Sequence, residues 1–394
     1  MCRARSSQRL PIHCILPPYI LKHILQGRTP ETRKLAEWAH HTITLSERIR
    51  GARAALGIIS TIATTPAGTK RRTVYDAGHL ERLPGRLVRG EGDPAVRDVA
   101  VNEAYDGAGD TYDFYYDEYR RNSIDDRGMR LDSSVHYGRE FDNAFWDGRQ
   151  MVYGDGDRVL FGRFTKCLEI IGHELTHGVT GAEARLEYQD QPGALNESIS
   201  DVMGSLVKQR KLGQSADQAD WLIGAGLLMP GVKGVALRSM KAPGTAYDDP
   251  RIGKDPQPAH MKDYVQTTDD SGGVHINSGI PNHAFYLAAT ALGGSAWKKA
   301  GRIWYVALRD RLRPTSDFAQ AAQVTAQVAA ELFGAGGREA TAVIEAWQGV
   351  GVEPATTAVR RTKSNANRVR TNGRVRGHQP KGRVRKRRAA RGRA

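Results

Sequence analysis

The spacing of apolar residues divides the chain into a strand-rich part and a helical part. From Arg72 to about Arg158, short pieces rich in Tyr, Val and Thr alternate with Gly and Asp, which is typical of strands joined by turns. After Phe161, apolar residues recur every three or four positions, as on one face of a helix. The clearest helical segments are 196–211, 280–292, 318–333 and 338–347. The pattern predicts an α+β fold with a β-rich lobe and a helical lobe.

Two segments of the strand-rich part allow a second interpretation. DTYDFYYDEY, 110–119, is grouped with the strand-like pieces, but its tyrosines also recur at three and four residues, which fits a helix. GDGD, 154–157, is interpreted as a turn, with a calcium loop as the alternative. One short acidic loop is far from a full oxygen shell for calcium, so the turn is favoured.

Both ends of the chain differ from its middle. A Pro-Pro turn and a helical stretch from about Glu31 to Ala55 precede a linker rich in Thr, Pro, Gly and basic residues at 61–72. Apolar periodicity ends after 349–354, and the tail beyond it is expected to be disordered. The predicted domains are an N-terminal segment (1–65), a β-rich lobe (66–162), a helical lobe (163–352) and a basic tail (353–394).

Composition excludes several classes of protein. Of the 394 residues 40% are hydrophobic, and no apolar run approaches the roughly 20 residues that span a bilayer. The basic N-terminus lacks the cleavage site of an ordinary secretory signal. The three cysteines, Cys2, Cys14 and Cys167, are too few and scattered for a disulfide framework. A reducing compartment fits best, and the expected location is the cytoplasm or an exported state reached without a classical signal.

The net charge of +15 belongs to the tail. From Arg360 to the end there are 15 Lys and Arg and no acidic residue, which leaves 43 basic and 43 acidic residues in 1–359. Such a tail can attach to nucleic acid or an anionic surface. The alternative is a solvated extension without a dedicated partner, which is favoured because no aromatic side chain is present to stack on bases.

The candidate chemistry centres on FTKCLEIIGHELTHGVTG, 164–181. His173 and His177 stand four residues apart, so on a helix both imidazoles lie on one face, as zinc ligands do. Glu174 can hold a water in line for attack instead of binding the metal. No proline interrupts 167–180, which supports the helix. The alternative is a pair of solvated or core histidines.

A third ligand must come from another part of the chain. Glu197, in GALNESISD, is a candidate on a second helix, and Asp201 follows one turn later. A carboxylate at that place can accept the free ring N–H of a zinc-bound histidine, which fixes its tautomer. The alternative is a solvated acidic face of a helix.

Several longer motifs resemble those of one peptidase family. NAFWDGRQMVYGDGD, HELTHGVTG, GALNESISD, LRSM and SGGVHINSGIPNHAFYL occur in the order found in thermolysin-type zinc metallopeptidases of the gluzincin group, and most closely in the protealysin branch. The resemblance runs from about Val74 to Val352. It implies a two-lobe fold with one zinc ion in the cleft between the lobes.

The resemblance implies roles for individual residues. His173, His177 and Glu197 would be the zinc ligands, and Glu174 the general base that activates a water. His275 and Tyr188 match the donors that stabilise the oxyanion, and Asp270 matches the carboxylate that orients the histidine. Asp201 would support a zinc ligand from outside the metal shell.

Substrate-binding residues follow from the same resemblance. Asn143 and the Ala144 backbone match the edge that pairs with an extended peptide, and Arg238 matches the residue that grips a substrate carbonyl. An apolar pocket for the residue after the cut bond would be formed by Phe161, Phe164, Ile170 and Leu237. We therefore expect cleavage on the amino side of Leu, Phe, Ile or Val.

Two features depart from thermolysin itself. Lys208 stands where thermolysin-like enzymes place a carboxylate of a calcium pair, so we expect the double calcium site to be absent, as in the protealysin branch. LPPYIL, 16–21, resembles the short inhibitory propeptide of that branch. A Cys14 thiolate could occupy the open zinc position in the precursor, and the alternative is a small buried cysteine.

Together these observations predict a monomeric zinc-dependent neutral endopeptidase that is made as a proenzyme and inhibited by its own propeptide. The competing class is a protein that binds nucleic acid or an anionic surface through its tail and carries an inactive metallopeptidase-like body.

Overall fold

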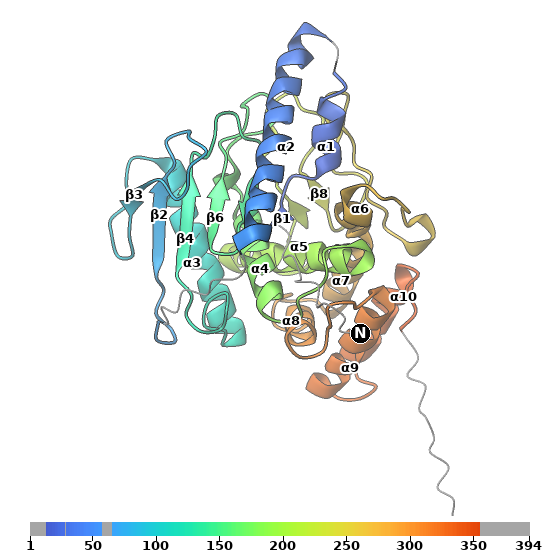
Figure 1. The fold of residues 1–394 in the computed structure, drawn as a ribbon. Helices are drawn as coiled ribbons and strands as arrows, with labels where there is room; N and C mark the ends of the chain where they lie inside the picture. Colours follow the sequence, from blue (N-terminus) through green and yellow to red (C-terminus); the bar gives the residue numbers. More distant parts are fainter. Residues whose placement is uncertain (1–12, 28, 57–64, 355–394) are drawn as a thin grey trace, which may run out of the picture. The chain divides into compact units, whose positions relative to one another are not determined.

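The computed structural model describes residues 13–27, 29–56 and 65–354, which belong to one compact unit (Figure 1). Cys2, the first part of the predicted linker and the basic tail lie outside the described residues. The predicted domain boundaries therefore stay predictions. Within the described part, no helix combines the length and apolarity that crossing a bilayer requires.

A six-stranded mixed sheet forms the first half of the body (Figure 1). Its strands lie in the order β1 (His13–Cys14), β5 (Ala144–Trp146), β6 (Gln150–Tyr153), β4 (Leu131–Val135), β2 (Arg72–Asp76) and β3 (Arg86–Arg89). β4 pairs in parallel with β2 and β6, and the other neighbours are antiparallel. The predicted β-rich part is confirmed, and its outer strand beside β5 comes from the N-terminal segment.

The segment 110–119 is a helix, so its grouping with the strand-like pieces is wrong. It forms the second half of α3 (Val99–Tyr119), which packs on β2 and β4. Asp98 begins the helix by accepting hydrogen bonds from the backbone N–H groups of Ala100 and Val101. The spacing of the tyrosines indicates the buried face correctly, since Tyr112, Tyr115 and Tyr119 are all buried.

The second half of the body is helical, as predicted. Its helices are α4 (Leu168–Ala182), α5 (Asp190–Leu212), α6 (Asp270–Asn277), α7 (Gly279–Leu292), α8 (Ala300–Asp310), α9 (Phe318–Phe333) and α10 (Arg338–Gly349). Short elements between them are η1 (Phe164–Lys166), β7 (Leu222–Ile223), β8 (Arg238–Ser239), β9 (Asp248–Asp249), β10 (Gly253–Lys254) and η2 (Met261–Asp263). One apolar core runs through both halves.

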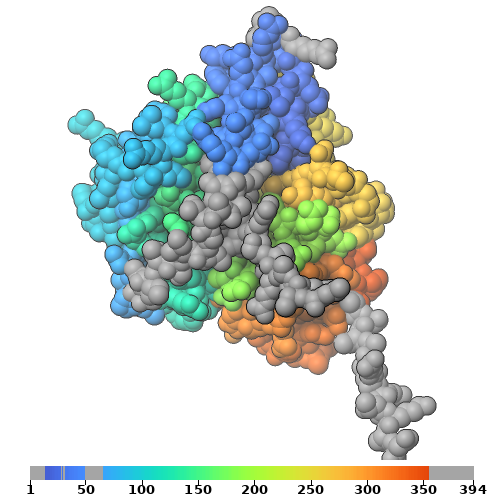
Figure 2. Space-filling view, in the orientation of Figure 1, coloured from blue at the N-terminus to red at the C-terminus, as the bar shows by residue number. Residues whose placement is uncertain are grey.

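Two N-terminal helices pack on the body. α1 (Pro18–Ile24) begins with Pro18, which suits the first turn because its missing N–H would have no partner there. α2 (Pro30–Leu56) agrees with the predicted helix from about Glu31 to Ala55. In the space-filling view these helices form the blue region between the β-rich half and the yellow part of the helical half (Figure 2).

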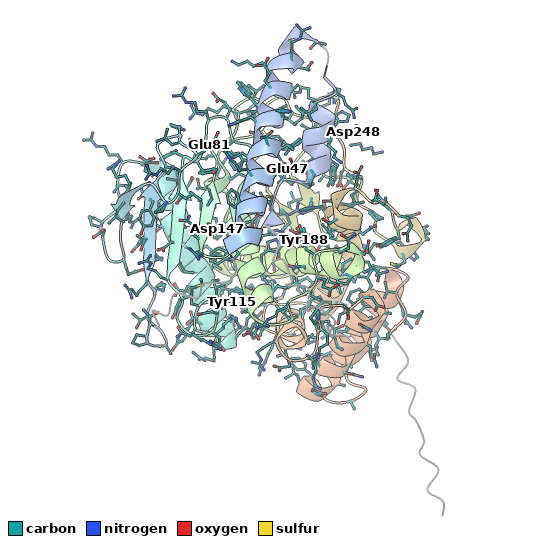
Figure 3. The ribbon with its side chains drawn as sticks, in the orientation of Figure 1. Glu47, Glu81, Tyr115, Asp147, Tyr188 and Asp248 are labelled. Atoms are coloured by element: carbon teal, nitrogen blue, oxygen red, sulfur yellow. The ribbon has the colours of Figure 1, made fainter. Side chains whose placement is uncertain are left out.

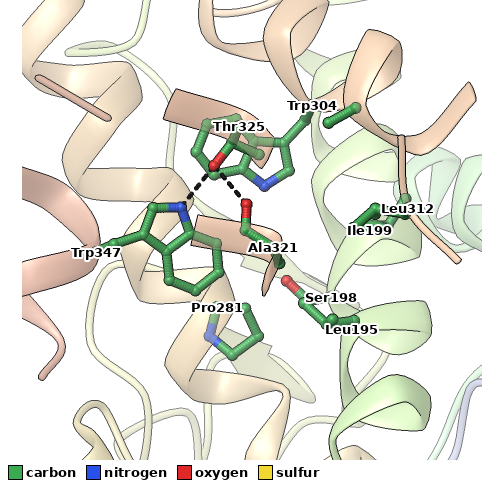
Figure 4. A pocket seen from close by; sticks show the side chains of 10 residues that line it. Leu195, Ser198, Ile199, Pro281, Trp304, Leu312, Ala321, Thr325 and Trp347 are labelled. Carbon is green, nitrogen blue, oxygen red and sulfur yellow. Dashed lines mark hydrogen bonds between the residues drawn. The ribbon is translucent and has the colours of Figure 1, made fainter. Parts of the chain in front are cut away.

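A small cavity lies inside the helical half (Figure 4). Its volume is about 10 Å³, and its lining includes Leu195, Pro281 and Trp304. The Trp347 indole N–H donates to the Thr325 hydroxyl beside it, at 2.9 Å. A space of this size holds at most one water, so it is a packing gap and not a substrate site.

The two helices that carry the candidate metal ligands cross at glycines. A Cβ atom added at Gly172 of α4 would lie 3.0 Å from the Gly204 Cα atom of α5. A Cβ atom at Gly204 would lie 2.3 Å from the Glu169 carbonyl oxygen. Larger residues would push the helices apart, because backbone atoms cannot move aside as the end of a flexible side chain can.

A Gly204→Ala substitution should therefore lower the free energy of unfolding by about 1–3 kcal/mol, the usual cost of overpacking a core. Gly181→Ala in α4 is the matched control, since a Cβ atom there meets no atom within 4 Å. The control should be neutral or slightly stabilising, and denaturant unfolding of the zinc-loaded chain measures both. Equal free energies of unfolding for the two variants would contradict the prediction that close packing at Gly204 stabilises the fold.

Candidate metal centre and active site

Three buried side chains from α4 and α5 converge on one point. His173 and His177 present Nε2 atoms 3.0 Å apart, and each lies 3.5 Å from a carboxylate oxygen of Glu197. Tetrahedral zinc with bonds of 2.0–2.1 Å places neighbouring ligand atoms about 3.3 Å apart. All three side chains are at most 2% exposed. The observed separations fit one zinc ion without rearrangement of the backbone.

The protonation of this group also fits a cation. Burial lowers the pKa of His177 to about 3, while Asp201 and Glu197 outweigh burial and raise the pKa of His173 to about 9. The two histidines thus differ in their tendency to hold a proton: His173 favours its charged form and His177 its neutral form. Glu197 Oε2 is buried and has no hydrogen-bond partner in the described part of the chain. A divalent ion would replace the proton and satisfy this oxygen.

Asp201 joins the metal group to the substrate-binding group. One of its oxygens lies 2.8 Å from His173 Nδ1, and Arg238 donates to both oxygens at 2.8 Å. Although burial opposes it, the charges of Arg238 and His173 hold the pKa of Asp201 below its usual range. Asp201 is thus ionised and fixes the tautomer of His173, with Nε2 aimed at the metal position.

Glu174 lies beside the metal group without belonging to it. Its Oε2 accepts the Trp146 backbone N–H at 3.0 Å, while Oε1 is buried without a hydrogen-bond partner among the described residues. In the chain without a cation, burial raises the pKa of Glu174 to about 8. The carboxylate is therefore held by one oxygen and has the other available for a water.

Tyr188 and His275 lie next to Glu197 of the metal group. The Asp270 carboxylate accepts from His275 Nδ1 at 2.6 Å and from the His275 backbone N–H at 2.9 Å. This leaves His275 Nε2 facing the cleft, 3.2 Å from the Tyr188 hydroxyl. Tyr188, which comes two residues before α5 and is labelled in Figure 3, also donates to Glu197. The structure thus brings together all the predicted metal ligands and oxyanion donors.

The N-terminal segment occupies the cleft as an extended peptide. Cys14 pairs with Phe145 of β5, and the Ile15 N–H donates to the Ala144 carbonyl at 3.2 Å. The Leu16 N–H donates to Asn143 Oδ1 at 3.1 Å. Arg238 donates to the Ile15 carbonyl at 3.1 Å. The Cys14 carbonyl oxygen lies 3.1 Å from His275 Nε2.

The residues of the predicted apolar pocket are part of the large apolar core. Ile15 is fully buried in the same apolar cluster as the four predicted pocket residues, Phe161, Phe164, Ile170 and Leu237. Phe161 and Phe164 pack with ring centroids 6.5 Å apart. Ile15 and the four predicted pocket residues thus all belong to the apolar interior.

Comparison with known proteins identifies this arrangement. Residues 64–181 match the model of the thermolysin metallopeptidase catalytic domain, and 184–352 match that of its alpha-helical domain. The chain belongs to the thermolysin family of metallopeptidases. It is therefore a thermolysin-like zinc metalloendopeptidase, with His173, His177 and Glu197 as the residues that would hold the zinc ion.

The similar proteins include two bacterial proteases and a solved precursor of protealysin. The chain is 51% identical over 347 residues to the extracellular metalloprotease of Pectobacterium carotovorum subsp. carotovorum, covering 87% of this chain and 97% of that protein. It is 48% identical over 346 residues to protease PrtS of a Photorhabdus strain, covering 86% and 92%. A solved precursor of protealysin from Serratia proteamaculans has 52% identity and a TM-score of 0.79, covering 86% and 99%. The thermolysin-like enzyme therefore has a precursor form.

Several residues that contact the zinc-site side chains of this thermolysin-like enzyme were not predicted from the sequence. His177 Nδ1 lies 2.9 Å from Asn196 Oδ1 and 3.0 Å from the Ser200 hydroxyl. Asn282 of α7 donates to Asp201 at 2.9 Å. Asn196 and Ser200 are four residues apart beside Glu197, so helical spacing could have indicated them. The sequence around Asn282 contains no pattern that indicates its contact with Asp201.

Lys208 forms part of an ion-pair group on α5. Its ammonium lies 2.9 Å from Asp220 and 3.5 Å from Glu169. Glu169 also accepts the backbone N–H groups of Gly224 and Ala225, both at 3.1 Å. Lys208, on which the expectation about calcium rests, thus places a positive charge beside the carboxylates of Glu169 and Asp220.

Cys14 is buried, and its side chain belongs to an apolar cluster with Leu45, Phe141 and Phe145. In the described part of the chain, the group of potential metal ligands around Glu197 does not include it. The hypothesis that its thiolate binds the zinc stays a prediction. A Cys14→Ser precursor as latent as the parent would remove it.

Proposed function

We propose that this chain is a neutral endopeptidase, made as a proenzyme, in which Glu174 activates a water and a bulky apolar residue follows the cut bond. The observation that carries the proposal is the binding of residues 14–16 in the cleft. Four protein groups hold this segment by its backbone in an extended form, as a peptide substrate must be held. Its central side chain, Ile15, is buried among apolar residues.

The residues around the cleft divide the chemistry between them. When bound, a zinc ion polarises the peptide carbonyl and lowers the pKa of a water. Glu174 accepts a proton from that water through its free oxygen and then gives it to the leaving amine. The Trp146 backbone N–H keeps Glu174 in place by holding its other oxygen. One carboxylate thus acts first as base and then as acid.

His275 and Tyr188 are suited to stabilise negative charge on the cut carbonyl. His275 Nε2 already lies 3.1 Å from the Cys14 carbonyl oxygen, and the Tyr188 hydroxyl lies beside it. Donors at such a position are worth a factor of about 10²–10³ in rate. Asp270 would keep His275 in the orientation that donation requires.

The N-terminal segment would inhibit the enzyme by occupying its substrate cleft. Its helices add contacts outside the cleft: Lys22 pairs with Asp269 at 2.8 Å, and His41 with Glu81 at 2.7 Å. In Figure 3, Glu81 lies beside α2, the helix that carries Glu47. These contacts attach the N-terminal segment to the body outside the substrate position. Because residues 14–16 occupy that position, removing the segment should make it accessible to substrates.

We infer that the enzyme is exported. The similar Pectobacterium protein is named an extracellular metalloprotease, which favours export over the cytoplasm. Detection of the chain in cells but never in culture medium would contradict this. The tail lies outside the described residues, and a nucleic-acid role for it stays a prediction that retention on DNA with and without residues 355–394 would test.

A Glu174→Ala variant should keep one zinc ion per chain and lose casein cleavage by a factor of at least about 10², the usual contribution of a general base. Metal analysis and casein assays on the mature form measure both. Glu345→Ala, at an exposed position on α10, is the matched control and should stay active. If the parent is as inactive as the variant after propeptide removal, the result would contradict the proposal. It would support the alternative of a binding protein with an inactive metallopeptidase-like body.

Two peptides should separate the predicted specificity from general peptide hydrolysis. One copies His13–Pro18 within a longer peptide, and the other replaces the isoleucine by aspartate. The mature enzyme should cut the first before the isoleucine, with a kcat/KM at least about 10-fold higher, because an apolar pocket does not solvate a charge. Mass spectrometry identifies the bonds. A preference for the aspartate peptide would overturn this part of the proposal.

We also infer that the double calcium site of thermolysin-like enzymes is absent, since Lys208 places a positive charge between Glu169 and Asp220. Calcium added to the metal-stripped, zinc-reloaded chain should leave the melting temperature unchanged, because only ligands that bind the folded state raise it. Magnesium is the control for ionic strength. A rise with calcium but not with magnesium would contradict the inference.

A further inference from the structure

A second group of potential metal ligands lies in the β-rich half, away from the catalytic zinc ligands. It consists of His79, His136 and Asp155, each of which offers one ligand atom within 4.8 Å of the other two. His79 lies in the loop between β2 and β3, His136 follows β4, and Asp155 belongs to the GDGD segment after β6. The three residues thus come from neighbouring strands of one sheet.

The backbone holds the two histidines side by side. The His79 N–H donates to the His136 carbonyl oxygen at 2.8 Å, and the ring centroids lie 5.4 Å apart. Both residues have left-handed backbone conformations, with φ of 59° for His79 and 54° for His136. Such conformations cost residues other than glycine about 1 kcal/mol each, so the surrounding structure enforces this placement.

The carboxylates around His136 are arranged as in a histidine metal site. Asp155 lies 2.8 Å from His136 Nδ1 and 3.6 Å from His79 Nδ1. Asp98, which caps α3, lies 2.7 Å from the other ring nitrogen, Nε2. A carboxylate on the far nitrogen fixes the tautomer and raises the basicity of the ligand, as Asp201 does for His173.

The other acid of the GDGD segment has a different role. Asp157 accepts the backbone N–H groups of Val159, Leu160 and Phe161 at 2.7–3.0 Å, so its carboxylate closes a turn. The nearby cation Arg163 is bound by Glu103 at 2.6 Å and does not pair with Asp155. Among the described residues Asp155 thus pairs with His136 and His79 only, and an ion bound there would replace these two contacts.

We propose that His79, His136 and Asp155 form a second transition-metal site, for zinc in the first place, that fastens the β2–β3 loop to the sheet. Two imidazoles and one carboxylate suit zinc and not calcium, which takes oxygen ligands only. Water can fill the fourth position, since the His79 side chain is 48% exposed. The loop also carries Glu81, which binds α2.

Metal binding at this site must displace a proton. Histidine binds metals only in its unprotonated form, so the site is best tested at pH 8.

The test compares the untagged full chain with His79→Asn, which removes an imidazole but tolerates the left-handed conformation. Both are stripped of metal and dialysed at pH 8 against a zinc series in the micromolar range. We expect two zinc ions per parent chain and one per His79→Asn chain, with a zinc-edge anomalous peak between His79 and His136 in parent crystals. His40→Asn, at an exposed position on α2, should bind as the parent does.

The proposal would be overturned by one zinc ion per parent chain throughout the series, or by two per His79→Asn chain. Casein cleavage by mature enzyme holding one equivalent of zinc should be equal for the parent and His79→Asn. Unequal cleavage would place His79 in the catalytic site and contradict a separate second site.

Discussion

The close crossing of α4 and α5 is the constraint on which the catalytic centre depends. Two ligands lie on one helix and the third on the other, and their ligand atoms meet at 3.0–3.5 Å. That spacing requires backbones nearly in contact, which Gly172 and Gly204 permit because neither carries a side chain. The distances between the ligand atoms thus depend on how closely the two helices pack, and therefore on glycines that are not ligands themselves.

Burial then determines how the charges must be arranged. His173, Glu197, Asp201 and Arg238 are each at most 1% exposed, and isolated charges at such depth would be very costly. Asp201 resolves this by binding the ligand His173, the substrate-binding Arg238 and the amide of Asn282. Because one carboxylate serves both groups, metal binding and the grip on the peptide carbonyl share a partner.

The N-terminal segment completes the sheet as well as filling the cleft. β1 pairs with β5, whose free edge would otherwise present unpaired N–H and C=O groups to any extended chain. The same edge, at Asn143 and Ala144, is the one proposed to receive substrates. A precursor that covers this edge protects the cleft and prevents unintended strand pairing by one set of contacts.

Sequence patterns were sufficient where the information is local. The spacing of His173 and His177 determined that two imidazoles share a helix face, and apolar periodicity located α5, α7, α9 and α10. Motif resemblance extended this to Glu197, His275 and Arg238. The composition of 110–119 was misleading, because its many tyrosines suggested a strand. Capping by Asp98 and burial on the sheet make this segment a helix.

Only the tertiary structure decided which distant side chains meet. Asn282 reaches Asp201 across 81 residues, and His79, His136 and Asp155 assemble because three strands end at neighbouring positions of one sheet. The physical reason is that a periodic pattern specifies the face on which a side chain lies, whereas its partner depends on how the chain folds back. The sequence by itself therefore determined the catalytic helix and suggested Glu197 and Asp201 as its partners, whereas only packing brought Asn282 to Asp201 and His79 to His136.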